Sequence, residues 1–173
     1  MMASEFCIAQ TDARVQASFA FNRTSSLTDV RLFACEARGI PPGTRTTDGT
    51  HGLEVSMESK LLERSEGRVT FAVEVVSQAV EVERVSEVPL TQVRVCFHLE
   101  YQLAEGYEPK DEEMDAFREG NAIFHCWPYA REMVTNLSMR LRPVGPPLPM
   151  LHLRQKQELY QKPRARKALK AGG

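Results

Sequence analysis

The 173-residue sequence contains no long hydrophobic run. None of its apolar stretches approaches the roughly 18 consecutive residues that a membrane-spanning helix needs. The N-terminus also lacks a basic segment followed by an apolar block, which is the mark of a secretory signal. We therefore expect a cytoplasmic protein with no membrane contact.

Cysteine is scarce, and the spacing that metal sites need is missing. The four cysteines lie far apart without any C-x-x-C pair, which argues against a zinc site or a disulfide framework. They are Cys7, Cys35, Cys96 and Cys126. The histidines His51, His125 and His152 show no metal-ligand spacing either, and His98 is expected to be an ordinary exposed residue of its strand. We expect no metal and no other cofactor.

The sequence also lacks the signature of a catalytic nucleophile beside a base. His125 and Cys126 are the nearest approach to one. Adjacent residues on a helix point about 100° apart, so the two do not form a general-base pair. We therefore expect a protein that is not an enzyme.

Acidic and basic residues are unevenly distributed along the chain. Residues 153–173 hold seven basic residues and one acidic residue, Glu158, so the remainder of the chain is acidic. A solvated, disordered tail is the favoured interpretation, and contact with nucleic acid is the alternative. We divide the chain into an N-terminal extension with a short helix (1–26), one domain (27–161) and a basic disordered tail (162–173).

Four runs with alternating apolar and polar residues predict an antiparallel sheet with one covered face. They span residues 27–37, 53–62, 68–82 and 93–103. Residues 38–52 form a loop rich in glycine and proline, whereas residues 64–67 are few enough to force a hairpin. In the first run Val30, Leu32 and Ala34 fall on one side.

Two helices are predicted after the strands. Acidic residues follow Pro109, which favours a helix start, and Gly120 is a plausible end of that helix. Pro128 suits the first turn of the second helix, whose apolar residues recur at helical spacing as far as Leu141. Because only helices follow the strands, we expect these helices to cover the sheet, which gives an α+β fold.

Residues 127–132, Trp-Pro-Tyr-Ala-Arg-Glu, and the following Pro-Pro-Leu at 146–148 resemble SecB, the tetrameric export chaperone. An E-E-x-x-x-F element at 112–117 is similar to one in the divergent SecB-like chaperones encoded beside toxin–antitoxin pairs. The resemblance implies a SecB-like fold, a four-stranded antiparallel sheet covered on one face by C-terminal helices. It also implies an ATP-independent chaperone of unfolded or pre-export polypeptides, or one dedicated to an antitoxin.

The same resemblance implies roles for individual residues. Client-peptide binding is expected at Phe97, Tyr101, Tyr107, Leu148, Met150 and Leu151. Docking to SecA is expected at Glu100. A homotetramer, built as a dimer of dimers, is expected to use Tyr129, Met133, Leu137 and Leu141.

Two departures from SecB bear on these expectations. Residues 150–156 replace the Asn-Phe-Asp segment of the family, and a basic tail replaces its acidic tail, which argues against SecA docking. A function of another class, an oligomeric scaffold whose basic tail contacts nucleic acid, remains the alternative.

Overall fold

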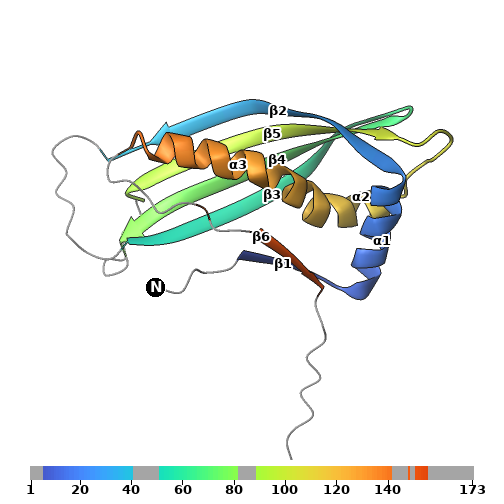
Figure 1. The fold of residues 1–173 in the computed structure, drawn as a ribbon, viewed down its shortest axis with the longest axis horizontal. Helices are drawn as coiled ribbons and strands as arrows, with labels where there is room; N and C mark the ends of the chain where they lie inside the picture. The colour runs from blue at the N-terminus through green and yellow to red at the C-terminus, as the bar shows by residue number, and fades with distance from the viewer. Residues whose placement is uncertain (1–5, 41–50, 82–88, 142–147, 149–150, 156–173) are drawn as a thin grey trace, which may run out of the picture.

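A four-stranded antiparallel sheet with helices packed on one face forms the centre of the protein, as the computed structural model shows (Figure 1). The structure describes residues 6–40, 51–81, 89–141, 148 and 151–155. The strands are β2 (Ser25–Arg38), β3 (His51–Ser65), β4 (Arg68–Glu81) and β5 (Thr91–Leu103). They lie in the order β2-β5-β4-β3, with every pair antiparallel. The predicted fold class is confirmed.

The central strands β4 and β5 supply about half of the hydrophobic core among the described residues. Buried and accessible residues alternate along β5, because successive side chains of a strand point to opposite faces. Phe97, Leu99 and Tyr101 lie on the covered face, which we call the core face. Glu100 and His98 lie on the opposite face, which we call the outer face. The alternation read from the sequence is confirmed for this strand.

A tight turn of two residues, Glu66 and Gly67, joins β3 to β4, as the hairpin predicted at residues 64–67 requires. Gly67 has a φ of 73°, in the left-handed region where glycine is favoured. A Cβ at this position would lie 3.2 Å from Nε2 of Gln102, which donates a 2.7 Å hydrogen bond to the Gly67 carbonyl. Both the backbone conformation and the close neighbour therefore favour glycine here.

Strand β2 lies at one edge of the sheet and carries two irregularities. Its register with β5 shifts between Leu27 and Asp29 and again between Leu32 and Ala34. Leu32 is opposite Phe97 on the core face, but Ala34 is opposite Cys96 on the outer face. The expectation that Leu32 and Ala34 share one side is therefore wrong, because the second bulge adds a residue and reverses the alternation.

One continuous helical run covers the sheet, where two separate helices were expected. It consists of α2 (Asp111–Phe117), a π-helical turn η1 (Arg118–Ala122) and α3 (Ile123–Ser138). Gly120 is buried inside η1 and does not end a helix. Pro128 lies inside α3, not in its first turn. Both positions were mispredicted, because local signals do not show that the face of α3 with Ile123, Cys126, Ala130 and Val134 is buried on both sides of the internal proline.

The π-helical turn is held by contacts from distant parts of the chain. Nη1 of Arg118 donates a 2.8 Å hydrogen bond to the carbonyl of Ser59 in β3. The hydroxyl of Ser18 lies 3.1 Å from Oδ1 of Asn121, and Arg14 pairs with Glu119. These contacts join the turn to α1 (Asp12–Arg23) and to the sheet.

Helix α1 contributes to the core, although it precedes the strands. Phe21 is fully buried, and its ring centroid lies 4.4 Å from that of Phe117 and 5.9 Å from that of Phe71. The expectation that only the C-terminal helices cover the sheet is therefore incomplete. The short helix expected in residues 1–26 is present, whereas the division of the whole chain into extension, domain and tail stays a prediction.

A two-stranded parallel ribbon lies beside α3, and the sequence did not predict it. It pairs β1 (Phe6–Gln10) with β6 (Leu151–Gln155). The statement that only helices follow the four strands is therefore wrong. The pairing joins segments near the two ends of the chain, so no local pattern reveals it (Figure 1).

Candidate client-binding and assembly surfaces

Helix α3 packs one face on the sheet and presents two flanks beside that face. Cys126, Ala130 and Val134 form the buried face. At about 100° per residue, Trp127 and Arg131 lie on one flank, and residues 125, 129 and 133 lie on the other, whereas Leu137 falls at the edge of the buried face. The two flanks border different parts of the fold, so each is a separate candidate surface.

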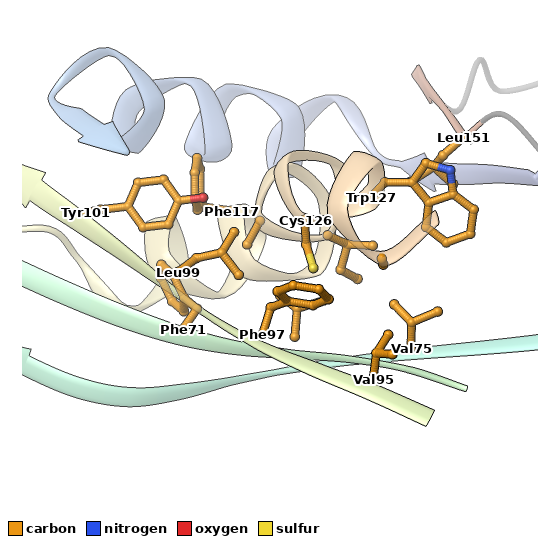
Figure 2. Close-up of a cluster of buried hydrophobic side chains, with 14 of the residues drawn as sticks. Phe71, Val75, Val95, Phe97, Leu99, Tyr101, Phe117, Cys126, Trp127 and Leu151 are labelled. Carbon is orange, nitrogen blue, oxygen red and sulfur yellow. The ribbon is translucent and has the colours of Figure 1, made fainter. Parts of the chain in front are cut away.

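The first flank contacts the segment that leads into β6. Leu148 and Leu151 are only 1% and 4% exposed. Nε of Arg131 donates a 3.0 Å hydrogen bond to the carbonyl of Leu148, and Leu151 lies next to the indole ring of Trp127 (Figure 2). We call this contact area, made of Trp127 and Arg131, the Trp127 surface. It already binds an apolar segment of the same chain.

Four of the residues expected to bind a client are buried in the single chain. Phe97 and Tyr101 belong to the core of the sheet, and Leu148 and Leu151 cover the Trp127 surface. Tyr107 is half-buried, and its hydroxyl donates a 2.6 Å hydrogen bond to the carboxylate of Glu113. Met150 lies outside the described residues.

The end of β5 near Tyr101 is closed, whereas binding of a client at this residue requires an open end. The ring of Tyr101 lies 6.1 Å from that of Phe21 in α1 and 5.1 Å from that of Phe117 in α2. Client binding at Phe97 and Tyr101 stays a prediction that requires the covering helices to move.

Tyr101 also joins the sheet to the second flank of α3. Its hydroxyl oxygen lies 3.0 Å from Nδ1 of His125, in one shared hydrogen bond. Burial lowers the pKa of His125 from its ordinary value and raises that of Tyr101. Both groups are therefore held neutral between α3 and β5.

We predict that acid weakens the fold through His125. The folded pKa lies below the unfolded one of about 6.5. As the pH falls through about 6.5, the unfolded chain gains a proton that the folded chain does not, so stability declines until the folded pKa is reached. Urea unfolding at pH 7.5 and 5.5 measures this loss. The loss should shrink in His125→Gln; an equal loss in both proteins would exclude His125 as its source.

The second flank borders the uncovered core face of β2. Tyr129 is 45% exposed, and its ring lies 6.3 Å from that of Phe97, the residue opposite Leu32 of β2. Leu27 and Leu32 are 38% and 40% exposed although they lie on the core face. The remaining residues expected in the oligomer interface, Met133, Leu137 and Leu141, are half-buried against the core. The exposed leucines of β2 were not singled out from sequence, because the edge position of this strand is a tertiary property.

Glu100, the expected SecA-docking residue, lies on the outer face of the sheet. Its carboxylate is 3.3 Å from Nε of Arg68 in the neighbouring strand. Phe33 stacks on His98 on the same face, with ring centroids 4.2 Å apart. SecA docking at Glu100 stays a prediction.

Within the described ranges, no three His, Cys, Asp or Glu side chains converge in a way that would hold a metal ion. Across the same ranges, no helix combines the length and the apolar character that crossing a membrane requires.

No protein-family model and no curated protein sequence matches the chain. Among solved structures it is similar to the Rv1957 SecB-like chaperone of Mycobacterium tuberculosis, solved in complex with a ChAD peptide from the Rv1956 HigA1 antitoxin. That match has a TM-score of 0.62 and 17% sequence identity, and it covers 80% of this chain and 97% of that one. A protein of unknown function from Streptococcus agalactiae matches with a TM-score of 0.37 and 11% identity, over 73% of this chain and 95% of that one. The first of these matches shows that the chain has the α+β fold of a SecB-like chaperone.

Proposed function

We propose that the protein is an ATP-independent chaperone that binds an extended apolar segment of another polypeptide on the Trp127 surface. The observation that carries this proposal is the segment of its own chain bound there. Two leucines three residues apart, Leu148 and Leu151, are buried, and a backbone carbonyl bonds to Arg131. Backbone contacts combined with apolar side-chain contacts allow many sequences to bind at one place.

A client would reach this surface by displacing residues 148–155. In the described part of the segment, the carbonyl of Leu148 accepts a hydrogen bond from Arg131, and β6 pairs with β1. A client with apolar residues at the same spacing competes for the same contacts. Binding then needs no nucleotide, because exchange of one segment for another leaves the buried apolar area nearly unchanged.

The first test is suppression of aggregation by the purified protein. A chemically unfolded model protein diluted into buffer should aggregate less in the presence of this chain, without added ATP. Unchanged light scattering at a several-fold excess of the chain would contradict a general chaperone function.

Variants of the Trp127 surface test the site. We predict that Leu151→Ala raises the affinity for an unfolded client severalfold, because the competing segment binds less tightly. Trp127→Phe should lower the affinity, because client and segment both lose contact with the larger ring. Fluorescence anisotropy of a labelled client peptide measures both, with melting temperatures as a check on folding.

Phe124→Ala is the matched control, because Phe124 is an exposed aromatic residue on the same helix. It should leave the affinity unchanged. If Leu151→Ala lowers affinity, the segment is part of the client-binding surface and not a competitor; if Phe124→Ala acts as strongly as Trp127→Phe, the client binds the outer face of α3.

A dedicated antitoxin chaperone is the second candidate function. It is supported by the structural likeness to a chaperone solved with an antitoxin peptide. A dedicated chaperone would bind one peptide tightly and suppress the aggregation of unrelated proteins poorly. Comparing the two activities in one preparation separates the candidates.

The alternative of another class, a scaffold that contacts nucleic acid, depends on residues 162–173, which lie outside the described residues. Salt-dependent binding to DNA or RNA that is lost when residues 162–173 are deleted would support it.

The chaperone proposal includes a homotetramer, with the α3 flank of Tyr129 and Met133 in an interface. Light scattering at micromolar concentration that gives the mass of one chain would contradict it.

A further inference from the structure

The parallel ribbon of β1 and β6 is separate from the main sheet. Within the described residues its two strands pair only with each other, and the four strands of the main sheet pair without them. Parallel pairs normally belong to larger sheets, and a two-stranded ribbon has little stability alone. Strand β6 contacts α3 as well as β1. The departure of β6 would therefore leave the pairing of the main sheet unchanged.

Strand β1 keeps its place when β6 leaves, because α1 anchors it to the core. Thr11 follows β1 directly, and its carbonyl accepts a 2.9 Å hydrogen bond from the backbone N–H of Val15 in α1. Further along this helix Phe21 is fully buried, and Arg14 pairs with Glu119 of η1. Without β6, the anchored β1 would present the backbone groups of its five residues to another strand.

We propose that a client replaces β6 as a parallel strand on β1. This inference rests on the proposed chaperone function at the Trp127 surface and adds a backbone contact to it. In the chain itself Leu151 lies beside the ring of Trp127 (Figure 2) and is also the first residue of β6, opposite Phe6. A client segment that takes the place of Leu151 therefore continues onto β1 without a turn.

The register of the ribbon defines the class of client. We number client positions from the place of Leu148, so position 1 lies at Arg131 and position 4 lies at Trp127. Positions 4–8 then pair with Phe6–Gln10. Successive residues of a strand alternate, so position 6 shares the side of position 4. The client is therefore an extended segment that runs parallel to β1, with apolar side chains at positions 1, 4 and 6.

Prolines in the chain's own segment are distributed as this binding mode requires. Proline has no N–H to donate, so it is excluded wherever a strand must donate to its neighbour. Four of the seven residues 143–149 are proline, whereas residues 150–155 contain none. A client should therefore tolerate proline at position 2. Prolines at both positions 5 and 6 should weaken its binding roughly tenfold, because one of two neighbouring N–H groups points toward β1.

Disulfide trapping of a synthetic peptide tests the register. The probe has the sequence of residues 146–155 with cysteine in place of His152, which is opposite Cys7 of β1. The full chain with Leu151→Ala is used, because its own segment competes less. Under mild oxidation the peptide should be joined to Cys7, and the added change Cys7→Ser should abolish the product. A peptide with cysteine in place of Leu153 should react roughly tenfold more slowly, because cysteines that point apart do not bridge.

A peptide with the reversed sequence tests the direction of the strand. It has the same composition, but fluorescence anisotropy should show roughly tenfold weaker binding, because parallel and antiparallel ladders place their hydrogen bonds differently. Equal binding of the two peptides, or equal trapping of the two cysteine peptides, would overturn the parallel register. A peptide that binds, loses affinity with Trp127→Phe and is not joined to Cys7 would overturn strand exchange and leave the proposed function standing. A peptide that does not bind the chain at all would contradict both.

Discussion

Phe21→Ala should destabilise the fold by about 3–5 kcal/mol, the usual cost of removing a buried phenylalanine ring. Phe21 is fully buried and lies among the rings of Phe71, Tyr101 and Phe117, at centroid distances of 5.9, 6.1 and 4.4 Å. Its loss opens a cavity between α1, α2 and the sheet. Urea unfolding followed by circular dichroism measures the change.

Phe19→Ala is the control for Phe21→Ala, because Phe19 lies on the same helix and is 49% exposed. We expect Phe19→Ala to lower the free energy of unfolding by less than about 1 kcal/mol, as most substitutions of exposed residues do. Equal and small effects of the two variants would mean that α1 is an appendage, and that residues 1–26 do not belong to the domain.

Val134→Asp should prevent folding or reduce stability by several kcal/mol. Val134 is buried on the face of α3 that packs on the sheet, and a carboxylate there is costly unless it is protonated. Asn136→Asp, an exposed change on the same helix, should have little effect. Thermal melting of both variants measures the difference.

Leu137→Asp separates folding from assembly on the same helix. Leu137 is half-buried against the core, so a charge there meets less of the core than one at the fully buried Val134. We expect the oligomer to dissociate while a folded chain survives. Unchanged size and melting temperature would mean that this flank is not in an interface.

The two flanks of α3 are separate candidate surfaces. The expected oligomer interface would use the flank of Tyr129 and Met133, whereas a client of the proposed chaperone would use the flank of Trp127 and Arg131. The buried face of the helix lies between them. If both proposals hold, exchange of a client on one flank leaves the interface on the other intact.

The sheet and the start of its covering helix were predictable from sequence, because their signals are local. Alternation along residues 93–103 identified β5 and its core face, and the short segment 64–67 identified the hairpin at Gly67. The acidic residues after Pro109 located the start of α2. Each of these signals depends on neighbours a few residues apart, where strand and helix periodicity apply directly.

The sequence by itself determined the α+β class, the four strands, the hairpin and the resemblance that the structural comparison supports. Only the tertiary structure decided which apolar residues of the sheet and of α3 are exposed and which are buried. Phe21 closes the end of β5, Leu148 and Leu151 cover Trp127, and the helix continues through Gly120 and Pro128. Each outcome depends on contacts between residues far apart in the chain, and their packing energy exceeds the local preferences of the residues involved.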